Sequence, residues 1–416
     1  MRYDSTKQNT LMKVETTLAA ILSKMPNLNK ARRDFLVHCF VMFLSVRGKI
    51  NFLSLGRHSE AYVESSYRNH FAMDFDFSSL NSSLVLSSGS GHYVVALDMS
   101  YIRKSGKHTE GVGKYWSGAS SRSEWGLEAG LLGVVDIDNH TAFHLEAIQT
   151  PSKLEREKNG ISYLSHCVDM VVKNKTHLEK ISNYIVVDAY FTKKDFILPL
   201  LEQTHLSIIG RLREDANLKY LYEAEQKKGR GRPRKYDGKI NLKKPQWKYF
   251  KKVYQDNTIC IYDAIVYAVF LKRTLRIALV QYTNEKGKTK QKIYFSTDIH
   301  LPAWLITKYY QARFQHEFII RDAKQATGLQ DCQARSRQKT EFHWNMALST
   351  VNLAKVQHWI TIPKDKRKAF SIKDIKMLYH NKLLLDRFFY ILQIEDDLTK
   401  NNPNIGQVYS FGTKAA

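Results

Sequence analysis

Short apolar runs that alternate with helical stretches between residues 93 and 212 are the feature that most constrains the fold of this chain. Helical patterns follow the third and fourth runs, over about Leu154–Lys175 and Lys194–Gln203. Three strands followed by a helix, a strand, a helix and a strand predict an α/β domain with a mixed sheet. The five runs are rich in β-branched residues and predict buried strands at Tyr93 to about Asp98, Gly126–Ile137, Ala142–Ile148, Asn183–Asp188 and Leu206–Leu212.

This α/β pattern is interrupted from about Arg213 to Asp298 by a basic tract and β-rich sequence, and helical periodicity resumes at Pro302. The serine- and glycine-rich stretch Ser82–Gly91 predicts a linker after a helical N-terminal part. We therefore expect four parts: a helical region at 1–88, an α/β core formed by 89–212 and 299–360, a basic β-rich insertion at 213–298, and a C-terminal helical region at 361–416.

The charge balance predicts a polyanionic partner. The chain has 64 Lys and Arg against 40 Asp and Glu, which gives a formal net charge of +24. Nucleic acid is the commonest partner of such a surface, and a merely soluble basic protein is the alternative. Apolar residues make up 43% of the chain, which is enough to build cores and argues against a disordered protein.

Cysteine usage and hydropathy favour a reduced, intracellular protein. The four cysteines are far apart and form no CxxC pair, so the sequence predicts neither a zinc site nor a disulfide framework. The longest apolar run, Phe35 to Val46, is too short to span a bilayer, and no signal-peptide pattern is visible. We therefore expect no membrane association and a cytoplasmic location.

The segment INFLSLGRHSEAYVESSYRNHF predicts a helix-turn-helix, with a turn at Gly56–Ser59, a second helix from Glu60 and Ser59 as its cap. An ordinary helical bundle explains the pattern equally well. If the motif reads DNA ends, its candidate contact residues are Tyr62, Ser66, Arg68 and Asn69.

The insertion carries a strongly basic segment. Between Lys227 and Lys252 there are twelve Lys or Arg residues and one acid, Asp237. Its GRGRPRK core resembles an AT-hook, an extended segment that fits the narrow minor groove of A·T-rich DNA. An unspecific phosphate clamp or a solvated loop is the alternative. The candidate DNA contacts are Arg230, Arg232, Arg234 and Lys235.

Two aspartates, Asp98 and Asp188, end predicted buried strands. Ligands of an α/β sheet bind in the crevice outside its strand ends, and Mg²⁺ prefers carboxylate oxygens. The two acids could therefore share a divalent cation. Either one could instead be a turn or cap residue, and other acids could be paired, such as Asp136, Asp138 and Glu146.

A third element, KYYQARFQHEFIIRDAKQATGL, has helical periodicity. At 100° per residue, Tyr310, Arg313, Glu317 and Lys324 fall within roughly 60° of arc on one helix. A carboxylate suits a metal ion, and Arg and Lys suit a phosphate backbone. The alternative is a solvated charged stripe, which many helices carry.

Together these segments resemble the bacterial insertion-sequence DDE transposases with the YREK signature, in the group named after insertion sequence four. LDMSYI resembles the segment of the first catalytic Asp, VVDAYFT that of the second, and the spacing from Tyr310 to Lys324 matches the signature. The resemblance runs from about residue 30 to about 360. Two positions depart from the family: Ser100 stands where Thr is usual, and His316 where an aliphatic residue is common.

The resemblance implies a ribonuclease-H-like catalytic core interrupted by a β-rich insertion, with an N-terminal helical DNA-binding domain. It implies that Asp98, Asp188 and Glu317 are the catalytic metal ligands, and that Tyr310, Arg313 and Lys324 hold DNA phosphates. The cofactor would be Mg²⁺, with Mn²⁺ as a substitute and two ions per active site. The reaction would be metal-dependent strand cleavage followed by strand transfer.

The implied partners are double-stranded DNA, as terminal inverted repeats and as target, and a second copy of the chain in a synaptic homodimer. Residues 366–398 are the natural place for a dimer contact, and the implied location is the bacterial nucleoid. A hairpin step would need an aromatic surface for a displaced base; Trp304, Phe314, Tyr294 and Phe295 are candidates or, alternatively, core residues. A domesticated non-cleaving DNA-binding protein and a structure-selective nuclease are the alternative functions.

Overall fold

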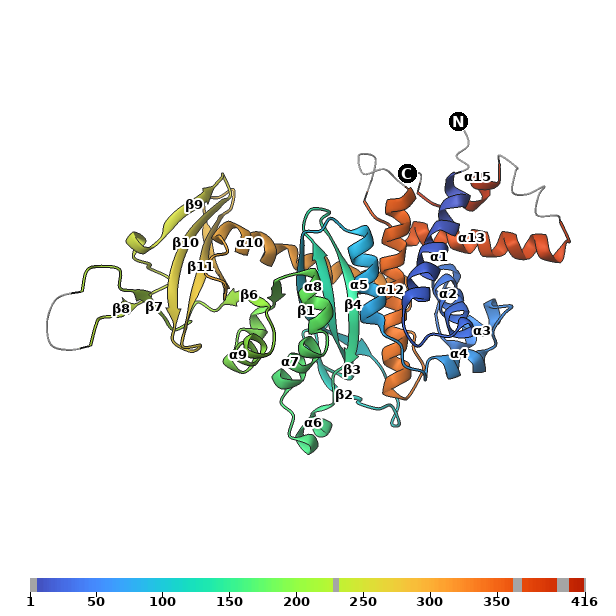
Figure 1. Ribbon diagram of the computed structural model, residues 1–416, viewed down its shortest axis with the longest axis horizontal. Helices are drawn as coiled ribbons and strands as arrows, with labels where there is room; N and C mark the ends of the chain where they lie inside the picture. The colour runs from blue at the N-terminus through green and yellow to red at the C-terminus, as the bar shows by residue number, and fades with distance from the viewer. Residues whose placement is uncertain (1–5, 227–231, 362–368, 395–403, 415–416) are drawn as a thin grey trace.

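The computed structural model describes residues 6–226, 232–361, 369–394 and 404–414. The chain forms an elongated molecule, with a β-rich end, a central sheet between helices, and an end built from the N- and C-terminal helices (Figure 1).

The central sheet has the strand order β4-β3-β1-β5-β6. Strand β1 runs antiparallel to β3 and parallel to β5, and β5 runs parallel to β6. This confirms the α/β class with a mixed sheet, and the sheet fits a ribonuclease-H-like fold. The strands are β1 (Tyr93–Arg103), β3 (Arg122–Asp136), β4 (Thr141–Gln149), β5 (Tyr184–Val187) and β6 (Ser207–Leu212).

Strand β1 is longer than the sequence predicted. It continues past Asp98 to Arg103, because β3 pairs with it along its whole length, as far as the pair Arg103–Gly126. The sequence also missed a short strand, β2 (Gly113–Ser117), which pairs with the first part of β3. Asp98 therefore lies inside a strand, and the expectation that it ends one is wrong.

Residues 213–298 extend the same sheet. Strand β12 pairs antiparallel with β6, so that all twelve strands are connected by hydrogen bonds. These strands form the yellow and green end of the molecule in Figure 1. They are β7 (Leu218–Leu221), β8 (Tyr236–Lys239), β9 (Lys251–Gln255), β10 (Ile259–Ala268), β11 (Arg273–Thr283) and β12 (Thr289–Ser296), with a short 3-10 turn η2 (Trp247–Tyr249).

Helices cover both faces of the central sheet (Figure 1). Helices α5 (Phe77–Ser88) and α12 (Arg337–Thr361) pack on β4. The other face carries α7 (Tyr163–Lys173), α8 (Lys175–Ile181) and α9 (Lys194–Gln203).

The single helix expected at about 154–175 is divided. Helix α6 (Lys153–Asn159) ends at Gly160, whose φ of +65° favours glycine, and α7 ends at Asn174.

The N-terminal helices are α1 (Thr6–Lys24), α2 (Lys30–Ser45), α3 (Phe52–His58) and α4 (Glu64–His70). The predicted turn is misplaced: Gly56 lies inside α3, and the second helix begins at Glu64. A Cβ at Gly56 would lie 2.7 Å from the backbone nitrogen of Glu64, so glycine is what lets α3 and α4 approach. The predicted linker is also wrong, because α5 continues to Ser88 with its apolar face on β4.

The predicted helix from Pro302 to about Ala326 is two helices, α10 (Ala303–Ala312) and α11 (Phe314–Ala326), separated by Arg313. Helix α10 packs on β11 and β12, whereas α11 packs on β4 and β3. The break therefore lies where the chain passes from the β-rich extension to the central sheet.

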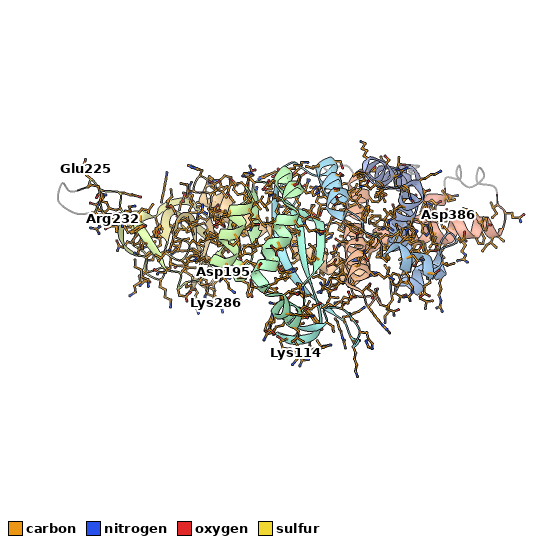
Figure 2. The ribbon with its side chains drawn as sticks, turned by 60° about the horizontal axis from the view of Figure 1, so that its bottom comes forward. Lys114, Asp195, Glu225, Arg232, Lys286 and Asp386 are labelled. Carbon is orange, nitrogen blue, oxygen red and sulfur yellow. The ribbon has the colours of Figure 1, made fainter. Side chains whose placement is uncertain are left out.

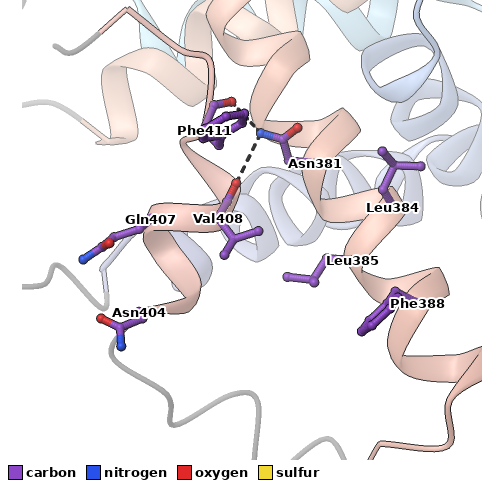
Figure 3. A pocket seen from close by; sticks show the side chains of 8 residues that line it. All are labelled: Asn381, Leu384, Leu385, Phe388, Asn404, Gln407, Val408 and Phe411. Atoms are coloured by element: carbon purple, nitrogen blue, oxygen red, sulfur yellow. Dashed lines mark hydrogen bonds between the residues drawn. The ribbon is translucent and has the colours of Figure 1, made fainter.

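The C-terminal residues form α13 (Ile372–Ile391) and the short α15 (Ile405–Tyr409). An apolar groove of about 540 Å³ separates them, lined by Leu384, Phe388, Val408 and Phe411 among others (Figure 3). Within the described residues, no helix is both long and apolar enough to cross a membrane.

Candidate active site

The sheet brings the two aspartates side by side. The parallel register of β1 and β5 pairs Leu97 with Val187. Asp98 and Asp188 are the next residues on each strand, so they leave the paired region at the same level. β5 ends there, and the short 3-10 turn η1 (Ala189–Phe191) carries the chain away. This opens the crevice outside the strand end in which ligands of α/β sheets bind.

Glu317 enters the same crevice from the first turn of α11. Asp98, Asp188 and Glu317 all line one pocket of about 1090 Å³. Thus three acids from a strand, a strand end and a helix, separated by more than two hundred residues of chain, meet at one cavity.

Arg313 lies between two of these acids. Its guanidinium is 3.3 Å from Asp98 Oδ2 and 3.1 Å from Glu317 Oε1. The Arg313 side chain is only 14% exposed, and its Nε has no hydrogen-bond partner among the described residues. A fixed positive charge therefore holds Asp98 and Glu317 together.

The electrostatics of the pocket favour a cation. Burial raises the pKa of Asp98, and the charge of Arg313 opposes that rise, while Glu317 and Asp188 add to it. Burial alone would lower the pKa of Arg313, but Asp98 and the neighbouring groups outweigh it and raise the pKa. Each carboxylate is thus kept ionised mainly by positive charge close to it.

The donor set fits a hard divalent cation, since Mg²⁺ prefers carboxylate oxygens and retains waters. Among the described residues, no three His, Cys, Asp or Glu side chains are grouped closely enough to form a metal site. In this arrangement the guanidinium of Arg313 occupies the space between Asp98 and Glu317.

The remaining signature residues are divided between two helices. Lys324, in α11, lines the acidic pocket and donates a hydrogen bond of 3.0 Å to the carbonyl of Tyr101. Tyr310, in α10, stacks on Tyr294 with ring centroids 4.4 Å apart. Burial, and to a lesser extent Asp188, raises the pKa of Tyr310. The break at Arg313 thus places the phenol against the β-rich extension rather than in the pocket.

His316 is a packing residue. It is 1% exposed, and burial lowers its pKa to about 3. A Cβ at Gly133 of β3 would lie 2.4 Å from His316 Nε2, so glycine makes room for the imidazole. The sequence left open whether His316 touches DNA or fills space, and the structure shows that it is buried between α11 and the sheet.

The predicted DNA contacts outside the pocket lie elsewhere on the molecule. Arg68 forms an ion pair with Glu64 one turn away and lies over the ring of Phe52. Tyr62 is half-buried against Phe35.

The basic segment is far from the acidic pocket. Arg232 is exposed at the tip of the β-rich end (Figure 2), and Lys235 is exposed close by. Arg234 pairs with Asp237 and lies over the ring of Tyr222 at 5.0 Å. Arg230 lies outside the described residues.

The aromatic candidates divide into two kinds. Tyr294 and Phe295 are buried core residues, whereas Trp304 and Phe314 are about half exposed, at 47% and 53%. The sequence missed the aromatic residues that do line the acidic pocket, among them Trp116 and Tyr190. The only sequence signal for Tyr190 is its place two residues after Asp188.

Comparison with known proteins agrees with this geometry. Residues 80–255 match the family model described as DDE superfamily endonuclease. No curated protein matches the chain. The matched segment contains Asp98 and Asp188 and ends before Glu317. The match supports a DDE nuclease or transposase type of enzyme, a class whose substrate is DNA and whose cofactor is a divalent metal ion, generally Mg²⁺.

Proposed function

We propose that this protein is a DDE transposase of the insertion-sequence type. It would bind terminal inverted repeats, cut the element out, and join its 3′ ends to target DNA by in-line phosphoryl transfer. The convergence of Asp98, Asp188 and Glu317 on one pocket is the observation that carries the proposal. A chain with a net charge of +24 suits a polyanionic substrate.

Asp98, Asp188 and Glu317 would hold two Mg²⁺ ions, for which Mn²⁺ could substitute. The ions, when bound, supply activation of the attacking water or 3′-hydroxyl and stabilisation of the leaving 3′ oxygen. Arg313 would then release its two carboxylates and turn to a DNA phosphate, where its planar guanidinium binds two oxygens at once. Lys324, on the same wall of the pocket, would pair with a neighbouring phosphate.

We assign the longer DNA contacts to two outlying surfaces. The basic segment, with Arg230, Arg232, Arg234 and Lys235, would bind the duplex away from the cleavage site. Arg68 on α4 would contact the DNA end recognised by the N-terminal helices. The expected place of action is the bacterial nucleoid.

We also propose a homodimer during synapsis, with α13 as the contact. Its apolar side chains Leu384 and Phe388 are 54% and 53% exposed and line the groove in Figure 3. Light scattering with and without repeat-end DNA tests this: a dimer that forms in the wild type and is lost in Phe388→Asp supports the contact, and a dimer that persists contradicts it.

Cleavage of end-labelled DNA tests the catalytic assignment. The substrate carries the inverted repeats that flank the gene, with Mg²⁺ present. We expect the wild type to nick and join the ends, and Asp188→Asn to lose at least a hundredfold in rate. Asp195→Asn is the matched control, because Asp195 is an exposed acid on α9, seven residues further on. Equal nicking by Asp188→Asn and Asp195→Asn would contradict the assignment.

The same assay separates the alternatives. A structure-selective nuclease would cleave without strand joining and without preference for the repeats. A domesticated DNA-binding protein would bind the repeats and cleave nothing. The intact set of three acids at one pocket favours the enzyme.

A further inference from the structure

We propose that the acidic pocket continues into a binding surface for unpaired DNA, formed by Trp116, Trp125 and Tyr190. This inference deepens the proposed function and rests on it, because it names the form of DNA that the pocket holds. We call these three residues, with the cations around them, the aromatic wall.

The wall is continuous with the three carboxylates. The pocket that Asp98, Asp188 and Glu317 line is also lined by Trp116, Lys114 and Tyr190. A second pocket of about 580 Å³ contains Trp125 and shares Tyr101 and Arg103 with the first. The surface therefore leads from the acids, over the end of β1, onto the β2–β3 hairpin.

The register of the hairpin sets the spacing of its aromatic side chains. Lys114 pairs with Trp125, and Trp116 pairs with Ser123. Successive side chains of a strand point to opposite faces, so Lys114 and Trp116 share one face. Trp125 shares that face because paired residues point the same way. The alternate residue Tyr115 is buried and anchors the hairpin by donating a hydrogen bond to the carbonyl of Gly111.

The aromatic side chains of the wall are exposed. The relative exposures are 61% for Trp116, 55% for Trp125 and 49% for Tyr190. Three large rings left in water over two adjoining pockets are unusual for a surface with no partner. Lys114 lies at an outer edge of the molecule, between these rings in the register (Figure 2).

Tyr190 is held in place from below. Tyr163 contacts it edge-on, with centroids 5.7 Å apart. Tyr163 in turn donates a hydrogen bond of 2.9 Å to the carboxylate of Glu128. Lys193 Nζ lies 3.7 Å from the centroid of the Tyr190 ring and places a cation beside the stacking surface. The ring is thus fixed next to Asp188, and a positive charge accompanies it.

This combination fits single strands better than duplex DNA. Bases of an unpaired strand expose their faces and stack on aromatic rings, while cations track the phosphates. In a duplex the faces are hidden in the stack, so the rings would gain little. The cations of the wall are Arg103, Lys114, Lys153, Arg156 and Lys193. We infer that the wall holds the strand that separates from the duplex end next to the carboxylates.

The test measures binding of the full-length protein to fluorescent DNA by anisotropy, in EDTA so that nothing is cut. The probes are a twelve-nucleotide single strand, a duplex with a splayed end, and a blunt duplex of the same sequence. Loss of one stacked base is expected to weaken binding about tenfold. We expect Trp116→Ala and Tyr190→Ala to lose this for the single strand and the splayed end, and to bind the blunt duplex unchanged.

Trp304→Ala is the matched control. Trp304 is 47% exposed but lies on α10, against the β-rich extension. It is expected to bind all three probes like the wild type, and Trp116→Phe is expected to retain most of the affinity. Thermal unfolding confirms that each variant folds.

Three results would overturn the proposal: equal affinities of Trp116→Ala and Trp304→Ala for the single strand, an equal loss for the blunt duplex, or full displacement of the strand by an acidic peptide. Failure of cleavage bears on the proposed function instead. Asp188→Asn, which should not cut, is still expected to bind the single strand.

Discussion

At the scale of single residues, Arg313 organises the candidate site. It is the positive charge between Asp98 and Glu317, and it stands at the break between α10 and α11. Its residue type and spacing were visible in the sequence, but its pairing with an acid 215 residues away was not. Only the packing of α11 on the sheet creates that pair.

We expect Arg313→Gln to destabilise the metal-free protein by about 2 kcal/mol, because two carboxylates in a partly buried pocket lose their shared charge-assisted hydrogen bonds. Mg²⁺ should raise the melting temperature of this variant more than that of the wild type, since the ion meets no competing guanidinium. Calorimetry at neutral pH with and without Mg²⁺ measures both effects. The control is Arg321→Gln, at a 54% exposed arginine on the same helix; equal melting temperatures for the two variants would refute the role of Arg313.

At the scale of elements, the contact between α11 and β3 fixes where Glu317 lies. Gly133 interrupts the register of β3 with β4 and accepts His316 against its bare backbone. A glycine inside a strand pattern signals a bulge or a close approach. The sequence carried that signal, but it did not show which side chain approaches.

Gly133→Ala should therefore move α11 away from the sheet. The new methyl group would lie 2.4 Å from His316 Nε2 and 2.8 Å from the carbonyl oxygen of Phe143. We expect a loss of about 1–3 kcal/mol in the free energy of unfolding, as for other overpacked cores. Urea denaturation measures it, and Gly118→Ala, where no atom lies within 4 Å, is the control.

A double variant checks the cause of that loss. His316→Ala removes the side chain that the methyl group would strike, so Gly133→Ala should cost less in its presence. Strictly additive effects would show that the two residues are not coupled through this contact.

At the scale of the whole molecule, the acidic pocket and the basic segment lie far apart. The exposed Arg232 stands at the tip of the β-rich end (Figure 2), beyond the strands that extend the sheet. A DNA duplex bound at both places would have to run along the molecule. The +24 charge favours such an extended contact, because each phosphate that is neutralised releases counterions.

Replacing Arg232, Arg234 and Lys235 together by Gln should weaken binding to blunt duplex DNA. Up to three phosphate contacts would be lost, so the slope of log K against log salt should fall by about 0.9 per contact. Titrations at several salt concentrations measure this slope. Affinity for the twelve-nucleotide strand should be unchanged, because the aromatic wall is a separate surface. An unchanged duplex slope would mean that these three residues do not contact DNA.

The sequence by itself determined the elements with strong local patterns. The helix at Lys194–Gln203 has the bounds that its periodicity predicted, and four of the five apolar runs are strands within a few residues of the expected ends. Apolar periodicity and turn residues act over short stretches of chain, so they can be read directly. Its acids, its basic tract and its net charge likewise follow from composition alone.

Only the tertiary structure decided how far β1 extends, where the helix around Arg313 breaks, and which side chains share the pocket. Strand β1 continues to Arg103 because β3 pairs with it, and α10 and α11 separate because they pack on different parts of the sheet. Long-range pairing and packing override local preference at these places. For the same reason, Trp116 joins Asp98 and Asp188 at one cavity, although nothing near it in the sequence indicates this.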